Sequence, residues 1–128
     1  MFNAAAAFSG FSVNDLEEAK TFYGEMLGIQ VNDEGMGLEL RFQNGHTVFI
    51  YEKEDHEPAT FTVLNFPVDD INAAVDSLVE AGVVMKRYDN MPGDQDGRGI
   101  MRGKAAGMGP DIAWFEDPAS NVLAVLEG

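Results

Sequence analysis

The sequence contains no cysteine, so disulfides, thiolate catalysis and zinc sites with cysteine ligands are excluded. Basic residues are scarce: 8 Lys and Arg stand against 22 Asp and Glu, which gives a formal net charge of −14. Nucleic acids and anionic membranes are poor partners for such a chain, because phosphate groups bind to basic surfaces. The acidic charge instead favours solubility, or a salty cytoplasm.

Long apolar runs are also missing, and none approaches the roughly 18–20 residues that a membrane span needs. The first residues, Met-Phe-Asn followed by four alanines, have neither the basic region nor the long apolar region of a signal peptide. We therefore expect a cytoplasmic protein without a membrane partner. The 128 residues suit a single domain, 1–128, with an ordinary apolar core.

The first half of the chain predicts a strand, a helix and three further strands. Residues 5–13 form the first predicted strand, and Asn14 caps a helix, with Glu17 placed as in a capping box. Gly28 ends this helix, since glycine is common just after a helix. Strands follow at 29–32, 37–43 and 47–52, and Asn44-Gly45 is a strong hairpin signal. The apolar stripe of the helix is Leu16, Ala19, Phe22, Tyr23, Met26 and Leu27.

The second half repeats this order. A strand at 61–68 precedes a helix capped by Asp69 and ended by Gly82, then a strand at 83–88, a glycine-rich segment at 89–110 and a closing hairpin at 112–127. The caps, stripes and stops of the two helices match at one offset, which predicts two similar modules at about 1–57 and 58–128. The alternative is two unrelated helices that follow the same capping rules. The second stripe is Ile71, Ala74, Val75, Leu78 and Val79.

With this order of elements the chain resembles the vicinal oxygen chelate superfamily of glyoxalase I, bleomycin-resistance and extradiol dioxygenase proteins. The residues that carry the resemblance are 11–23 with Leu27-Gly28, then Val68-Asp69-Asp70-Ile71, and Trp114-Phe115-Glu116-Asp117-Pro118. Ala119-Ser120-Asn121 stands where the family commonly has Asp-Gly-Asn. The resemblance implies an α+β fold, in which two βαβββ modules form a cupped mixed or antiparallel sheet. It also implies a ligand in the cup and a homodimer.

In the family's enzymes a divalent metal in the cup is held by His, Glu or Gln and polarises the substrate. Carried over by position, the four ligand places fall on Phe8, on Ile50 or Tyr51 with Glu52 adjacent, on Val63, and on Ala124. Phenyl, isopropyl and methyl groups cannot bind a cation, whereas such sites need about four to six oxygen or nitrogen ligands. We therefore expect a member of the family without a metal or another cofactor.

The two histidines of the chain do not restore a metal site. His46 follows the Asn44-Gly45 turn, and an exposed turn residue is the expectation for it. His56 lies in the acidic run Glu54-Asp55-His56-Glu57. This run could hold a cation loosely or could be a solvated loop, as charge runs usually are.

Strand alternation predicts which side chains line the cup. The same alternation packs Phe11, Val13, Phe66 and Val68 against the helices. The resulting cup is mainly apolar and aromatic, as pockets for small organic ligands are; alternatively, these side chains simply fill the space between sheets. The predicted lining residues are Phe8, Ser12, Tyr51, Phe61, Val63, Asn65, Trp114 and Ala124.

Five of the eight basic residues lie between Lys86 and Lys104, including Arg98 and Arg102. One hypothesis is a flap over the cup, in which Arg98 and Arg102 offer guanidinium groups to an anionic ligand such as a carboxylate. The other is a loop whose basic side chains pair with surface acids.

The sequence thus predicts first a binding protein for a small, partly aromatic organic ligand. A second hypothesis is a metal-independent lyase or isomerase for a small organic, carboxylate-bearing substrate, with Glu116, Glu52 or Tyr51 as proton carriers. A metal-dependent glyoxalase or dioxygenase ranks third, because the side chains at the expected ligand positions cannot bind a metal ion.

Overall fold

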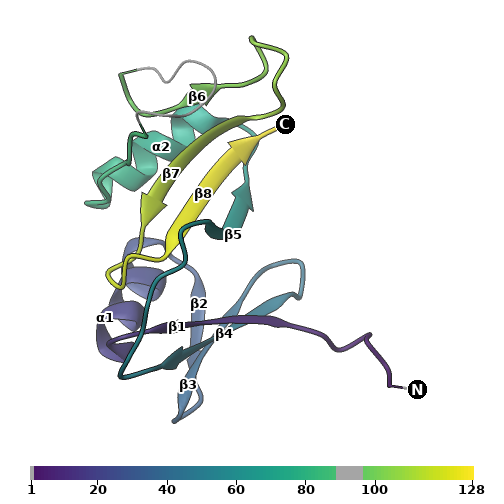
Figure 1. Ribbon diagram of the computed structural model, residues 1–128, viewed down its shortest axis with the longest axis vertical. Coiled ribbons are helices and arrows are strands. Elements are labelled where there is room, and N and C mark those ends of the chain that lie inside the picture. The colour runs from purple at the N-terminus through teal and green to yellow at the C-terminus, as the bar shows by residue number, and fades with distance from the viewer. Residues whose placement is uncertain (1, 89–96) are drawn as a thin grey trace. The chain divides into compact units, whose positions relative to one another are not determined.

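The computed structural model describes residues 2–88 and 97–128 (Figure 1). The chain divides into two compact units, Met1–Pro58 and Ala59–Gly128. Each unit contains one four-stranded sheet and a helical segment, which is the α+β arrangement of two modules expected from the sequence. No helix within the described ranges is long and apolar enough to cross a membrane.

The first unit has the strand order β1-β4-β3-β2. Strand β1 runs parallel to β4, and the other neighbours are antiparallel. Val13, Leu40 and Ile50 are buried, because alternate side chains of these strands point towards the helical segment. The elements are β1 (Ser9–Val13), α1 (Leu16–Lys20), η1 (Thr21–Met26), β2 (Gln30–Asp33), β3 (Gly37–Arg41) and β4 (Thr47–Glu52).

The helical segment of the first unit changes from an α-helix to a π-helix half-way along. After α1 it widens into the π-helical turn η1, where the Leu27 N–H donates to the Phe22 carbonyl, five residues back. Phe22 and Tyr23 are adjacent in sequence, yet both are buried, with their rings edge-to-face at 5.0 Å. Gly28 follows with a φ of 71°, so it ends the segment as predicted.

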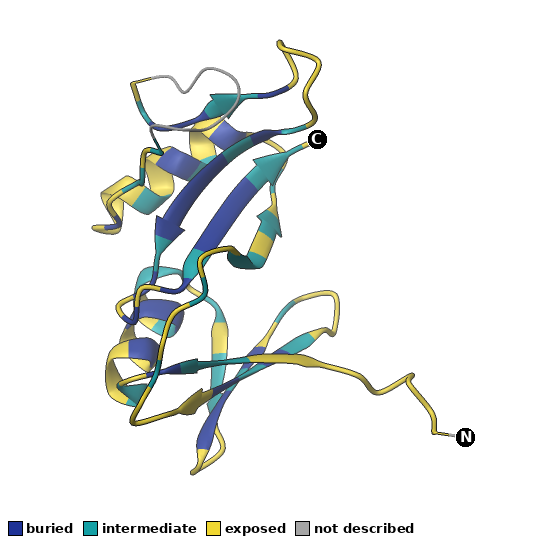
Figure 2. Ribbon diagram, in the orientation of Figure 1, coloured by how far each residue is buried: buried dark blue, intermediate teal, exposed yellow. Residues whose placement is uncertain are grey.

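The second unit has the order β5-β8-β7-β6, which is the topology of the first unit. Helix α2 packs against β7 and β8, and these two strands are largely buried (Figure 2). Of the predicted stripe, Ile71 and Val75 are buried, whereas Val79 is 55% exposed. The elements are β5 (Thr62–Pro67), α2 (Ile71–Glu80), β6 (Met101–Arg102), β7 (Asp111–Glu116) and β8 (Val122–Glu127).

The strand predicted at 83–88 is wrong. Only Met85 forms a bridge, to Phe115, and the Lys86 N–H donates to the Trp114 carbonyl over 2.8 Å. Strand β6 pairs with the same strand, β7, further along. The edge of this sheet is therefore built from two short pieces, and residues 89–96 between them lie outside the described part.

Both helix caps lie one residue later than predicted, at Asp15 and Asp70 instead of Asn14 and Asp69. The Asp15 carboxylate accepts from the backbone N–H groups of Glu17 and Glu18, at 3.0 and 3.2 Å. Asp70 accepts from the N–H of Ala73 at 3.1 Å. In each pair two good capping residues are adjacent, so composition alone could not choose between them.

A second carboxylate reaches each helix from the end of a strand. Glu52, the last residue of β4, accepts from the Leu16 N–H at 3.0 Å, and Glu127 of β8 accepts from the Ile71 N–H at 2.9 Å. The Lys104 ammonium group bonded to Glu127 lowers the pKa of that carboxyl, and the Ile71 N–H adds to the effect. The two modules thus repeat one way of fixing a helix to its sheet.

We expect Asp15→Ala and Asp70→Ala each to lower the free energy of unfolding by about 1 kcal/mol, because each removes the acceptor of an N-cap. Denaturant unfolding would measure the loss. The matched controls, Asn14→Ala and Asp69→Ala, should change stability much less. Equal losses in the controls would contradict the assignment of the caps.

Candidate binding site

In the first unit, the sheet face away from the helical segment carries two aromatic rings. Phe49 and Tyr51 of β4 are stacked at 6.2 Å with an interplanar angle of 18°. Gly37 of β3 lies beside them, and a Cβ there would overlap the Phe49 ring and come within 2.7 Å of the Ile50 carbonyl oxygen. The absence of a side chain at Gly37 therefore lets the Phe49 ring lie flat across the sheet.

A polar pair adjoins these rings. Ser12 is the lateral neighbour of Tyr51 in the parallel pairing of β1 and β4, so both side chains emerge on the open face. The Ser12 Oγ lies 2.6 Å from the Nδ1 of His56, which is half-buried. The turn after β4, closed by the His56 N–H bonded to the Lys53 carbonyl, returns His56 to this face. One residue of the acidic run, His56, thus contacts the sheet, although a solvated loop was one expectation for this run.

A hydrogen-bonded group lies further along the same face. Glu39 of β3 accepts from the Asn32 amide at 3.0 Å and from the Arg41 guanidinium at 3.1 Å. The Asn32 hydrogen bond is the main cause that lowers the pKa of Glu39, and Arg41 adds to it. The carboxylate therefore stays ionised, and its two partners hold its orientation.

In the second unit the Trp114 indole lies on the sheet face away from α2, where it is largely buried. The Trp114 Nε1–H donates to the Thr62 Oγ1 at 3.1 Å, and the Tyr88 ring meets the indole edge-to-face at 5.5 Å. Ala124 is the cross-strand neighbour of Trp114, and Asn65 is the neighbour of Ala124 on the other side. Burial is the main cause that raises the pKa of Tyr88, so its hydroxyl keeps its proton.

The alternation predicted for β5 is corrected by a bulge. The register shifts between Thr62 and Leu64, so Val63 is the extra residue and Phe61 precedes the strand. Thr62 and Asn65 consequently share the face of Trp114, whereas Phe66 stacks on the buried Phe115. A bulge cannot be read from alternation, which is why Thr62 was missed.

Three further predicted lining residues are placed elsewhere. Phe8 precedes β1 and is 67% exposed. Arg98 pairs with Asp76 of α2, and Arg102 donates to the Asn72 amide at 2.8 Å and lies 3.6 Å from Asp111. Both guanidinium groups thus contact α2 and its surroundings, on the side opposite to Trp114. The structure thus gives both guanidinium groups partners in their own unit, and the flap stays a prediction.

The side chains present do not fit the metal of the family's enzymes. Ile50 is buried on the helix side, Tyr51 offers only a phenol, and Ala124 has no donor atom. Glu52, the one carboxylate beside these positions, is bonded to the Leu16 N–H. In residues 2–88 and 97–128, no group of three or more His, Cys, Asp or Glu side chains could hold a metal ion.

Solved structures similar to this chain come from several bacteria. A putative glyoxalase family protein from Bacillus anthracis is 20% identical with a TM-score of 0.65, and the match covers 100% of this chain and 99% of the other. TnmS3, an antibiotic binding protein from Streptomyces sp. CB03234, is 22% identical with a TM-score of 0.64 over 98% of both chains. The fosfomycin resistance protein FosX from Listeria monocytogenes is 14% identical with a TM-score of 0.68, covering 100% and 95%.

At these identities the similarity shows the fold. The comparison with curated proteins gives no match. The family model "Glyoxalase/Bleomycin resistance protein/Dioxygenase superfamily" matches residues 6–125, which is nearly the whole chain. The chain therefore belongs to the glyoxalase, bleomycin resistance protein and dioxygenase superfamily.

Proposed function

We propose that the chain is a metal-independent binding protein for a small, partly aromatic organic molecule. The observation that carries this proposal is an aromatic pair on the open face of each sheet, beside groups that form hydrogen bonds. Such a combination of ring surface and few polar groups is typical of small-molecule sites. The ligand would lie in the cup that the family resemblance implies.

In the first unit, the Phe49 and Tyr51 rings offer a surface for a planar ligand. Tyr51 is 39% exposed, so its ring remains accessible on this face. Ser12 and His56, which are bonded to each other, are the polar side chains next to it. This arrangement favours a flat molecule with a polar edge.

In the second unit, Trp114 is the largest aromatic side chain of the open face, and 8% of it is exposed. Its N–H is already bonded to Thr62, so the indole is held in one orientation. Ala124 beside it is small, and Asn65 adds one amide. A ligand ring could therefore contact the indole while its polar groups bind the amide.

The charge of the chain favours a neutral or cationic ligand. The net charge of −14 attracts cations over the whole surface. Arg98 and Arg102, the groups that suggested an anionic ligand, are engaged with Asp76, Asn72 and Asp111. Two similar structures carry the words "antibiotic binding" and "fosfomycin resistance" in their names, which supports a small organic ligand.

The second candidate is a metal-independent lyase or isomerase. Of the proton carriers predicted from sequence, Glu52 caps α1, and Glu116 pairs with Lys86 at 3.4 Å, which leaves Tyr51. The contact between Ser12 and His56 favours this candidate, because imidazole is the commonest acid–base group in enzymes.

A panel of planar aromatic compounds, glycopeptide drugs and small carboxylates should contain a compound that raises the melting temperature with concentration. Binding should also change the fluorescence of Trp114, the single tryptophan of the chain. Tyr51→Ala should weaken binding by about 1–2 kcal/mol, roughly 5–30-fold, since it removes ring surface.

The matched control is Met36→Ala, which removes an apolar side chain that is 90% exposed in the turn between β2 and β3. It should leave affinity unchanged. The proposal is contradicted if no compound shifts the melting temperature, or if both variants lose affinity equally.

Chelator treatment should leave the melting temperature unchanged, and Mg, Mn, Zn and Ni ions should not raise it. The reason is that Phe8, Val63 and Ala124, which stand where the resemblance implies ligands, have no donor atoms. Metal analysis of the purified protein provides an independent check. A strong rise in melting temperature with one of these ions would contradict this prediction and support the metalloenzyme hypothesis.

We also propose that the protein works in the cytoplasm as a homodimer, as the family resemblance implies. Light scattering of the purified protein should give twice the mass of 13.9 kDa. A monomer across a range of protein concentrations would remove this part of the proposal.

A further inference from the structure

We propose that Glu39 selects the ligand of the first unit: a planar heteroaromatic molecule whose edge carries an amino group that donates to the Oε2 atom of this carboxylate. The inference rests on the proposed binding function and names the ligand class of the same sheet face. Glu39 acts here as a specificity-determining residue, because it distinguishes ligands by the group at their edge.

Both partners of Glu39 bond the same carboxylate oxygen. The Asn32 amide and the Arg41 guanidinium donate to Oε1, at 3.0 and 3.1 Å. Within residues 2–88 and 97–128, the structure gives the other oxygen, Oε2, no hydrogen-bond partner. A carboxylate has about four acceptor sites on its two oxygens, so Oε2 can accept from a ligand while Oε1 keeps both of its partners.

The carboxylate is also held in position before a ligand arrives. The Asn32 amide that donates to Glu39 accepts in turn from the Gln30 amide at 3.4 Å, so one orientation of Asn32 satisfies both contacts. The Glu39 side chain is 25% exposed, which makes it partly enclosed and still accessible to a ligand. An acceptor that is already oriented loses little conformational freedom on binding.

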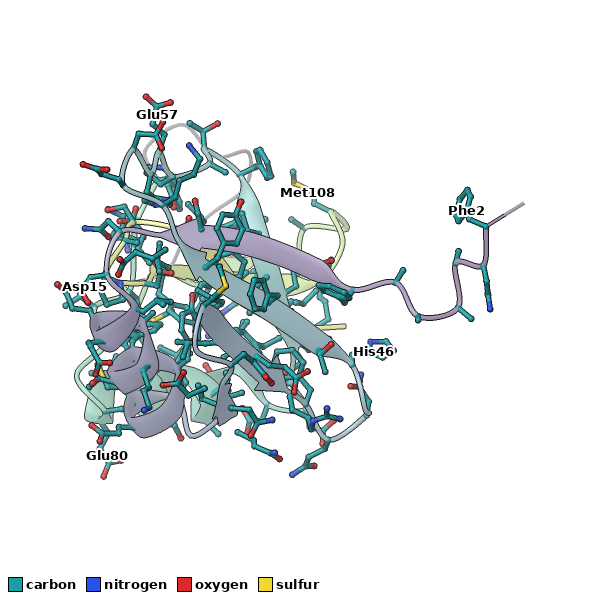
Figure 3. All side chains as sticks on the ribbon, turned by 90° about the horizontal axis from the view of Figure 1, so that it is seen from below. Phe2, Asp15, His46, Glu57, Glu80 and Met108 are labelled. Atoms are coloured by element: carbon teal, nitrogen blue, oxygen red, sulfur yellow. The ribbon has the colours of Figure 1, made fainter. Side chains whose placement is uncertain are left out.

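Glu39 lies directly beside the rings that are proposed to contact a planar ligand. It is the cross-strand neighbour of Phe49, and Phe49 stacks on Tyr51 at 6.2 Å. The turn that joins their strands, β3 and β4, contains His46 (Figure 3). Cross-strand neighbours have Cβ atoms about 4.5–5.5 Å apart, so a flat molecule lying on the rings can bring one edge to Oε2.

The charges at Glu39 favour a neutral donor at the edge of the ligand. A carbonyl or carboxylate edge would place its lone pairs against those of Oε2, whereas an N–H group is attracted to them. The Arg41 guanidinium, bonded to Oε1, offsets part of the carboxylate charge and disfavours a full positive charge on the ligand. An uncharged amino group on a heteroaromatic ring meets both conditions.

This carboxylate is particular to the first unit. Glu52 and Glu127 play the same part at the ends of β4 and β8, which makes Ala124 the counterpart of Phe49. The antiparallel neighbour of Ala124 is Trp114, whose indole N–H is a donor only. The second unit therefore has an aromatic ring where the first has an acceptor, and the selection of a donor belongs to the first unit.

The probes are 6-aminoquinoline and 6-methylquinoline, two flat molecules of nearly the same shape. Both can contact the aromatic rings, but only the amino group donates a hydrogen bond. Titration calorimetry gives the Kd of each compound, and the ratio of the two Kd values reports the contribution of the donor.

We expect the wild type to bind 6-aminoquinoline more tightly than 6-methylquinoline, and Glu39→Gln to reduce this preference about tenfold, because a hydrogen bond to a charged acceptor is lost. In this variant Asn32 and Arg41 retain the remaining amide oxygen, so the new NH₂ group takes the place of Oε2 and can only donate.

Asp33→Asn provides a matched control. It removes the same charge from the neighbouring strand β2, but the Asp33 carboxylate lies 3.6 Å from the Lys20 ammonium group of the helical segment, on the other face of the sheet. This variant should keep the preference of the wild type. Circular dichroism and melting curves would show that both variants are folded.

If both compounds bind and the wild type and Glu39→Gln show the same preference, the role of Glu39 is overturned and the binding function stands. An equal loss of preference in Asp33→Asn also overturns the role, because the donor then responds to the overall negative charge. If neither compound binds to the wild type, the inference is overturned, and the wider panel of compounds decides separately on the binding function.

Discussion

The carboxylate at the end of the last strand fixes each helix to its sheet. Glu52 and Glu127 accept a backbone N–H of the first helical residue, while Asp15 and Asp70 cap the same turns. The first N–H groups of a helix have no partner within it and carry a partial positive charge, so two carboxylates satisfy them and also oppose that charge. The helix is thereby held at one end of the strand and over one face.

This constraint decides which side chains remain for a ligand. With the helical segment over one face, Val13 and Ile50 are buried beneath it, and their neighbours Ser12 and Tyr51 emerge on the other. The same constraint determines what Glu52 binds. This carboxylate, which lies beside a ligand position that the family resemblance implies, accepts from the Leu16 N–H at the start of α1.

Much of the fold could be predicted, because it depends on local signals. Gly28 and Gly82 have positive φ values where helix ends were predicted, and β4 begins and ends where its alternation indicates. The failures depend on the environment. Phe22 and Tyr23 are buried as their place in the stripe predicts, but the π-helical turn η1 that holds them was not predicted. The strand at 83–88 is wrong because β7 pairs with two short pieces instead.

The candidate site was harder to predict than the fold. Ser12 and Tyr51 follow from alternation, but Thr62 depends on a bulge that moves the register by one residue. His56 is 44 positions from Ser12, and only the turn closed by its bond to Lys53 brings the two together. A run of charges predicts a solvated loop, and nothing in the run itself indicates which side chain returns to the sheet.

The two modules share one topology and have diverged in chemistry on their open faces. The counterpart of Trp114 in the first unit is Glu39, since each faces the corresponding residue of the parallel-paired strand, Ala124 or Phe49. One unit therefore presents an indole held by a hydroxyl, and the other presents an ionised carboxylate and an imidazole. The two faces therefore differ in the groups they carry: aromatic rings with one hydroxyl partner in the second unit, and polar groups beside two rings in the first.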